Sequence, residues 1–169
     1  IIGAFAAGNK VTLKPSELTP YTSSLISKIV REVFEAKHVV AILGDQNIAQ
    51  NLLSQRWDYI FFTGSVATGK SIYEAAAKNL TPVTLELGGK NPCIIDATAN
   101  IKLAAKRIAW GKFLNAGQTC IAPDYLLVHE SIKVDFIQYL KKEILHAYSE
   151  NPEKSIDFPR IINKKHFER

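Results

Sequence analysis

The residue best suited to covalent chemistry is Cys120, which lies in a run of small and polar side chains, NAGQTCIAPD, at residues 115–124. A thiolate in such a flexible segment can meet a substrate and attack it as a soft nucleophile. Glu86 follows Val83-Thr84-Leu85, at the end of a strand that we expect to be buried, where a carboxylate is costly without a role or a partner. It is suited to activating water as a general base. From these residues alone, an ordinary free cysteine and a salt-bridged structural glutamate remain open as alternatives.

A second chemical pattern is the segment GSVATGKS at residues 64–71, which matches the phosphate-binding loop G-x-x-x-x-G-K-S of nucleotide triphosphatases. The loop comes late in its predicted domain, and apolar strands that end in an acid, such as those before Glu86 and Asp96, are too common to identify a Mg²⁺ ligand. A glycine-bounded turn that opens a helix binds other phosphates equally well, including the pyrophosphate of a dinucleotide. A triphosphatase, a dinucleotide site and a turn without a ligand all remain open at this point.

Composition and charge limit the kinds of partner that we expect this chain to bind. Hydrophobic residues make up 47% of the 169 residues, which is enough for one core or parts of two. The net charge of +5 comes from scattered basic residues, as in a solvated surface, so we expect no nucleic-acid partner. We also expect no membrane-spanning segment, because no apolar run is long enough.

The two cysteines, Cys93 and Cys120, are too few for a disulfide framework in a chain of this size. We expect both to be free thiols in a reducing, cytoplasmic compartment, with Cys93 in the core because it lies in an apolar run. The histidines are not spaced as metal ligands, and we predict no metal site.

Hydrophobic patterning predicts an α/β fold with a parallel sheet covered by helices, in which ligands bind at the carboxyl ends of the strands. On the helix that starts at Thr19-Pro20, apolar residues form a stripe that comprises Leu25, Ile29 and Val33, with Ile26 and Val30 beside it. The predicted strands are residues 11–13, 38–43, 58–62 and 81–87, and the other helices are residues 47–55 and 69–79.

The pattern changes after Gly88-Gly89, so we place a domain boundary between residues 1–87 and 88–169. A short strand at residues 93–95 precedes a helix that Asn100 can cap and that runs to about residue 114. A strand at residues 125–128 then leads into an amphipathic helix at residues 131–147, whose apolar row is Ile132, Phe136, Leu140 and Ile144.

Four segments decide between the alternatives when they are taken together: LKPSE (13–17), FTGS (62–65), LELGGKNP (85–92) and GQTCIAPD (117–124). In this order and spacing they resemble the aldehyde dehydrogenase superfamily, over nearly the whole chain. The segments NLTPVTLELGGKNPCIID and GQTCIAPDY are most similar to the class 3 branch of fatty and aromatic aldehyde enzymes. That branch often has Asn where this chain has Ser65. The resemblance implies an incomplete Rossmann-type parallel sheet followed by part of an α/β catalytic domain.

The resemblance also implies a role for each matching residue. Cys120 would be the nucleophile and Glu86 the general base. Lys14 and Glu17 would hydrogen-bond the adenine-side ribose of NAD or NADP, and Gly44 would let the adenine approach the backbone. Gly64 to Gly69, with the Ser65 hydroxyl, would face the pyrophosphate. The Leu87 backbone would lie by the nicotinamide amide. Lys70 would then be an incidental, solvent-facing residue.

The implied reaction is oxidation of an aldehyde to a carboxylic acid through a thiohemiacetal and a thioester on Cys120, in a parent protein that is a homodimer. We expect the oxyanion-stabilising Asn and the first strand of the dinucleotide fold upstream of Ile1, and the dimerisation arm beyond Arg169. A central fragment of this kind is expected to be inactive alone. The remaining alternatives are a P-loop nucleotide triphosphatase and a non-catalytic nucleotide-binding relic.

Overall fold

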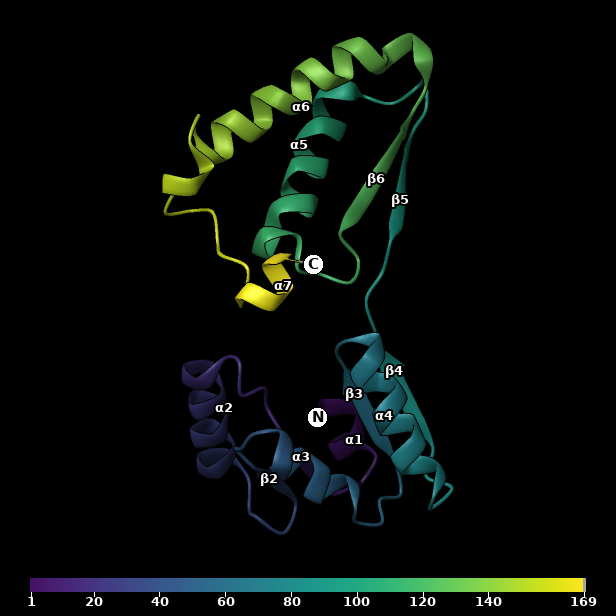
Figure 1. Ribbon diagram of the computed structural model, residues 1–169, viewed down its shortest axis with the longest axis vertical. Helices are drawn as coiled ribbons and strands as arrows, with labels where there is room; N and C mark the ends of the chain where they lie inside the picture. The colour runs from purple at the N-terminus through teal and green to yellow at the C-terminus, as the bar shows by residue number, and fades with distance from the viewer. Residues whose placement is uncertain (169) are drawn as a thin grey trace. The chain divides into compact units, whose positions relative to one another are not determined.

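The computed structural model describes residues 1–168, and the chain divides into two compact units (Figure 1). The first unit contains residues 1–62 and 67–84, and the second contains residues 63–66 and the chain from residue 85 onward. The first unit holds α1 (Ile2–Ala6), β1 (Val11–Leu13), α2 (Pro20–Val33), β2 (Val39–Ala41) and α3 (Gln46–Leu53). The elements β3 (Ile60–Thr63), α4 (Val66–Ala77) and β4 (Val83–Glu86) follow. A boundary between the two units falls within each of these three elements.

The second unit contains β5 (Asn91–Ile95), α5 (Ile101–Phe113), β6 (Pro123–Val128), α6 (Lys133–Tyr148) and α7 (Lys164–Glu168). Short 3-10 helices occur at η1 (Leu114–Gly117), η2 (Glu130–Ile132) and η3 (Pro152–Lys154). The helices α1 and α7 were not predicted from the sequence. The helix α1 is a short run, IGAFA, without a polar face, so it shows no apolar stripe of the kind on which such a prediction depends. Within residues 1–168, no helix combines the length and apolar character needed to cross a membrane.

The strands pair in parallel, as predicted, but in three separate two-stranded sheets rather than one. In β1–β2, Val11 lies opposite Val39 and Leu13 opposite Ala41. In β3–β4, the Ile60 N–H donates to the Pro82 carbonyl at 3.0 Å. Among the described residues no strand joins one pair to the next, so the predicted α/β fold is present with an interrupted sheet.

The helix α2 buries a different face from the one its apolar stripe predicts. Leu25, Ile29 and Val33 are exposed, whereas Val30 is buried beside the serines Ser23 and Ser27. The Ser23 hydroxyl donates to the Ser16 carbonyl at 2.7 Å, which brings a small polar residue inward against the preceding turn. Helical spacing identified two adjacent apolar rows but could not show which of them faces the strands.

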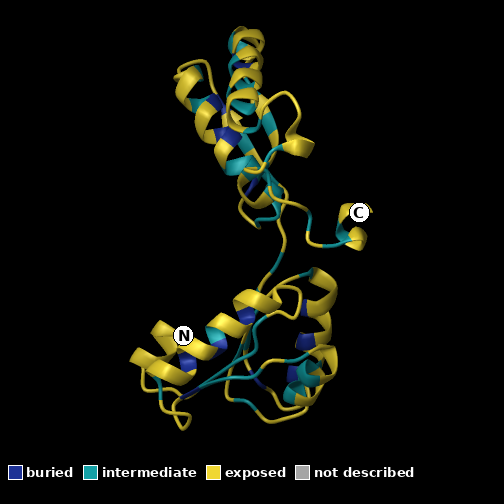
Figure 2. Cartoon of the chain, turned by 90° about the vertical axis from the view of Figure 1, so that its left-hand side faces the viewer, coloured by how far each residue is buried: buried dark blue, intermediate teal, exposed yellow. Residues whose placement is uncertain are grey.

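The core of the second unit forms where α5 and α6 cover the β5–β6 pair. Phe136 and Ala105 are fully buried, and Ile95 and Ile108 complete the cluster. Ile132 and Leu140 of the predicted α6 row pack against this cluster, as does Cys93, which confirms that this thiol belongs to the core region. The Asn100 side chain accepts from the Leu103 N–H at 3.1 Å, which confirms the predicted cap of α5. Figure 2 shows how few positions in either unit are buried.

The central side chain of this core gives a stability prediction. We expect Phe136→Ala to lower the free energy of unfolding of the second unit by about 3–5 kcal/mol, because it removes a fully buried ring and leaves a cavity. Ile94→Ala is the control, since Ile94 is 73% exposed on the same sheet and should change stability by about 0.5 kcal/mol or less. Urea denaturation followed by circular dichroism measures both, and equal losses would contradict the assigned core.

Candidate active site

Cys120 is exposed in a turn that connects η1 to β6. The Ala122 N–H donates to the Thr119 carbonyl at 3.1 Å and closes this turn. Upstream of this turn, just before Gln118, Asn115, Ala116 and Gly117 all have left-handed backbone with φ of 53°, 54° and 76°. Asn and Gly tolerate this conformation, but Ala rarely adopts it, so the loop holds Ala116 in a strained conformation near the thiol.

Two carboxamide side chains hold this loop. The Asn91 amide Nδ2 donates to the Cys120 carbonyl at 2.6 Å and to the Ala122 carbonyl at 3.2 Å. The Gln118 amide Nε2 donates to the Arg160 carbonyl at 3.2 Å, and its Oε1 accepts from the Ile162 N–H at 3.0 Å. The loop that carries Cys120 is therefore fixed to β5 on one side and to the segment after η3 on the other.

Opposite charges meet at the end of the same loop. The Asp124 carboxylate lies 3.3 Å from the Lys90 ammonium and 3.8 Å from that of Lys112. The Lys90 side chain is 83% exposed, so its ion pair contributes little to stability. The Asp124 and Lys112 side chains are about one-third exposed, so that pair is less accessible to water. The Lys90 pair connects the segment after Gly89 to the start of β6, and the Lys112 pair connects α5 to it.

Glu86 ends β4 and is exposed, contrary to the prediction of a buried carboxylate. The ladder partner of β4 is β3, where the Gly64 N–H donates to the Glu86 carbonyl at 2.9 Å, and no other strand of the described residues continues this sheet over the carboxylate. Glu86 and Cys120 belong to the same unit. Gly89 is three residues after Glu86, so the chain between them spans at most about 11 Å. Gly89 lies close to the Cys120 carbonyl, because an added Cβ would be 2.4 Å from that oxygen.

Two of the predicted cofactor residues bond to each other. The Lys14 ammonium lies 2.9 Å from the Glu17 carboxylate and also donates to the Pro15 carbonyl at 3.1 Å. The hydrogen bond from Lys14 holds the pKa of Glu17 below its usual value. Together they form a compact pair directly after β1, at the carboxyl end of that strand.

Gly44 follows β2 and has a structural reason to be glycine. Its φ is 157°, and an added Cβ would lie 2.4 Å from Cγ1 of Ile48, on the first turn of α3. The Asp45 carboxylate caps that helix by accepting from the N–H groups of Asn47 at 2.9 Å and Ile48 at 3.2 Å. Close packing between the strand end and α3 therefore accounts for Gly44 without a ligand.

The phosphate-loop pattern spans the end of β3 and the start of α4. Gly64 is exposed, Ser65 and Leu87 are half-buried, and Gly69 is buried within α4. Lys70 is exposed, as predicted. The first N–H groups of a helix lack intrahelical partners, so the start of α4 offers donors suited to a phosphate.

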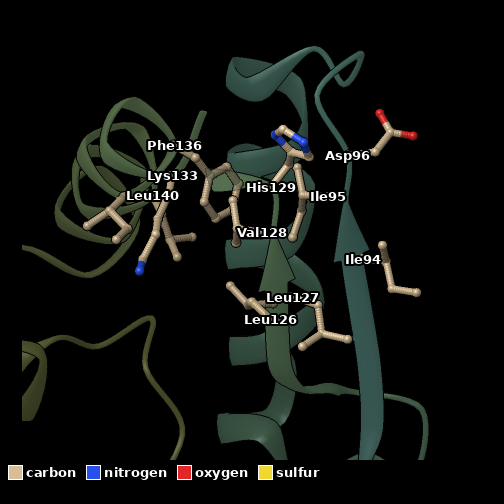
Figure 3. A pocket seen from close by; sticks show the side chains of 11 residues that line it. Ile94, Ile95, Asp96, Leu126, Leu127, Val128, His129, Lys133, Phe136 and Leu140 are labelled. Atoms are coloured by element: carbon tan, nitrogen blue, oxygen red, sulfur yellow. The ribbon is translucent and has the colours of Figure 1, made fainter. Parts of the chain in front are cut away.

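An apolar hollow in the second unit contains none of the predicted site residues. Figure 3 shows it between β5, β6 and α6, lined mostly by apolar side chains. Asp96, weighed above as a possible Mg²⁺ ligand, accepts from the Thr98 N–H at 2.8 Å and from its hydroxyl at 2.7 Å, and these bonds lower the pKa of Asp96. Among residues 1–168, no three His, Cys, Asp or Glu side chains gather as a metal site.

Parallel strand pairs with covering helices define an α/β class of protein, and this one carries an exposed cysteine thiol in the turn before β6. The family model described as "Aldehyde dehydrogenase family" matches residues 1–169, and the chain belongs to this family. The resemblance found in the sequence is thereby confirmed, and neither the P-loop triphosphatase nor the non-catalytic relic is favoured.

Curated relatives match over the whole chain. The 4,4'-diaponeurosporen-aldehyde dehydrogenase of Staphylococcus aureus is 52% identical over 169 residues, which are 100% of this chain and 37% of that protein. Aldehyde dehydrogenase family 3 member A2 of Macaca fascicularis is 47% identical, with 100% and 35% covered, which supports the class 3-like assignment. The dimeric NADP-preferring aldehyde dehydrogenase of Canis lupus familiaris is 48% identical, with 100% and 37% covered. The chain thus spans little more than a third of the length of these relatives.

Among solved structures, the substrate-bound state of Staphylococcus aureus AldH superposes with a TM-score of 0.88 at 52% identity. The match covers 99% of this chain and 37% of that one. This agreement confirms the aldehyde dehydrogenase-like α/β fold.

The close approach of Gly89 to the thiol turn gives a second prediction. Gly89→Ala should displace the Cys120 turn, because the new Cβ would lie 2.4 Å from the Cys120 carbonyl oxygen. Gly88→Ala is the matched control, since no atom lies within 4 Å of its Cβ position. Iodoacetamide labelling measured by peptide mass spectrometry should show a changed rate at Cys120 only in Gly89→Ala, with Cys93 as the internal reference. Identical labelling in both variants would contradict the geometry of the turn.

The Lys14–Glu17 pair gives a prediction about pH. The pKa of Glu17 is lower in the folded state, so its carboxylate stabilises the fold above the ordinary carboxyl pKa, and this contribution is lost as the pH falls through the lowered value. Glu17→Gln should therefore reduce the free energy of unfolding by less than about 1 kcal/mol near neutral pH, and by nothing in strong acid. Glu32→Gln, which removes a more exposed pair at 3.8 Å from Lys28, should cost less. A pH-independent loss in Glu17→Gln would contradict this account.

Proposed function

We propose that the protein that carries this chain oxidises an aldehyde to a carboxylic acid with NAD⁺ or NADP⁺, through a covalent intermediate on Cys120. The observation that carries the proposal is the exposed Cys120 thiol in a tightly held turn of a chain that belongs to the aldehyde dehydrogenase family. The other thiol, Cys93, packs against the core and is a poor candidate for attack on a substrate.

The reaction follows from two side chains. The Cys120 thiolate attacks the aldehyde carbonyl and forms a tetrahedral thiohemiacetal. A bound NAD(P)⁺ would supply the hydride acceptor, and Cys120 would then hold the acyl group as a thioester. Glu86 then removes a proton from water, the hydroxide attacks the thioester, and the carboxylic acid leaves as the thiol is restored. The exposed position of Glu86 leaves its carboxylate open to solvent water.

The cofactor would be held by residues at the carboxyl ends of the strands. We assign Lys14 and Glu17 to the adenine-side ribose, because their existing ion pair presents a donor and an acceptor together. The exposed Gly64, the Ser65 hydroxyl and the start of α4, which includes Gly69, suit the pyrophosphate. Gly44 would let the adenine approach the backbone, and the Leu87 backbone would lie by the nicotinamide amide.

The remaining parts of the proposal concern the whole protein. Residues 1–87 would belong to the NAD(P)-binding domain and residues 88–169 to the catalytic domain. We propose either NAD⁺ or NADP⁺ as the cofactor, since the canine relative is named NADP-preferring and a solved structural neighbour is named NAD-dependent. The name of the canine relative also includes "dimeric", which supports a homodimer. A reducing, cytoplasmic location is proposed from the two free thiols.

Three variants of the complete polypeptide test the function. Cys120→Ser should abolish aldehyde-dependent NAD(P)H formation, whereas Cys93→Ser should keep it, because only the first thiol is exposed. Glu86→Gln should retain a first turnover of NAD(P)H and slow the steady state by about 100-fold or more, as loss of a general base does. Stopped-flow absorbance at the reduced nicotinamide band separates the two phases. Full activity in Cys120→Ser would overturn the proposal.

A further inference from the structure

The peptide between Cys120 and Ile121 is the central peptide of the turn that carries the thiol. The bond from the Ala122 N–H to the Thr119 carbonyl closes this turn and leaves the Cys120 carbonyl without a partner within it. Turns of types I and II differ by a flip of this central peptide. The flipped form requires positive φ at the third residue, here Ile121, which does not have positive φ.

Asn91 supplies the missing partner from outside the turn. Its Nδ2 uses one hydrogen for the Cys120 carbonyl at 2.6 Å and the other for the Ala122 carbonyl at 3.2 Å. The bond to the Cys120 carbonyl requires that carbonyl to point toward the Asn91 side chain on β5, and a flip of the central peptide would break it. Asn91 is the first residue of β5 and lies opposite Pro123 in the β5–β6 register, so its carboxamide is mounted on a paired strand.

Gly89 leaves the space in which this contact forms. A Cβ at position 89 would lie 2.4 Å from the Cys120 carbonyl oxygen and 3.0 Å from Asn91 Nδ2. The donor and the acceptor of the short hydrogen bond thus meet directly against a backbone that carries no side chain.

We propose that Asn91 is a positioning residue for Cys120, whose carboxamide fixes the Cys120–Ile121 peptide and thereby the direction in which the thiol leaves the turn. This inference rests on the proposed role of Cys120 as the nucleophile. Attack on a carbonyl depends on alignment within about 3–3.5 Å, and small displacements lower the rate of the chemical step more than they weaken binding. The expected signature is therefore a loss in kcat with little change in KM for the cofactor.

Three substitutions in the complete polypeptide separate positioning from simple stability. Asn91→Asp keeps the shape but replaces both donors with an acceptor, Asn91→Ala removes the side chain, and Asn91→Ser keeps a single hydroxyl donor. Asn100→Ala is the matched control, because Asn100 belongs to the same unit and its side chain caps α5 through the Leu103 N–H. Loss of this cap costs a comparable amount of stability, about 1 kcal/mol.

We expect Asn91→Asp and Asn91→Ala to slow hydride transfer in a single turnover by about tenfold or more, as expected for loss of two hydrogen bonds. Asn91→Ser should recover part of the rate, and Asn100→Ala should keep the original rate. Wild-type single-turnover rates in Asn91→Asp, or an equal loss in Asn100→Ala, would overturn the positioning role.

Labelling of Cys120 by iodoacetamide gives a readout that does not depend on the proposed reaction. The Asn91 variants should change its rate relative to Cys93, whereas Asn100→Ala should not. If Cys120→Ser retained aldehyde oxidation while Asn91→Asp still altered Cys120 labelling, the proposed function would fail and the positioning of the thiol would stand. Unchanged labelling in every Asn91 variant would overturn the positioning itself.

Discussion

The parallel pairing of β5 with β6 is the constraint on which the thiol site depends. A parallel pair needs a long crossover, which α5 and the loop after it supply. That crossover enters β6 at Pro123, just after the turn that holds Cys120, so this turn ends where the strand pair begins. The same crossover packs α5 on the sheet, and Phe136 of α6 fills the space between the helices and the strands. Burial of this core thus holds both ends of the thiol loop.

The thiol loop combines an irregular backbone with many polar anchors. Left-handed backbone at Asn115 and Ala116 costs free energy, and side-chain amides from Asn91 and Gln118 offset that cost with long-range hydrogen bonds to backbone groups. Each anchor comes from, or reaches, a segment far away in sequence. An exposed thiol can therefore remain accessible to a small molecule while its peptide stays fixed, which suits covalent catalysis.

The sequence predicted the strand and helix order well, because strong periodicity and caps such as Asn100 are local signals. It also placed Cys120 in a loop of small residues and Cys93 in an apolar strand, and the structure finds the first thiol exposed and the second packed against the core. It failed where the outcome depends on tertiary contacts: the buried face of α2 and the exposure of Glu86. The contacts of Asn91 and Gln118 were missed as well, because they join residues 29 and 42 positions apart. The only local signal for Asn91 was a carboxamide directly before Pro92, at the start of a strand.

The most direct test of the account is to trap the acyl intermediate. The Glu86→Gln variant of the complete polypeptide would be mixed with an aldehyde and NAD(P)⁺, quenched in acid within the first turnover and digested for mass spectrometry. We expect an acyl group on the peptide that contains Cys120 and none on the peptide that contains Cys93. NAD(P)H formation without an adduct on Cys120, or with the acyl group on another residue, would contradict the central claim that Cys120 is the nucleophile.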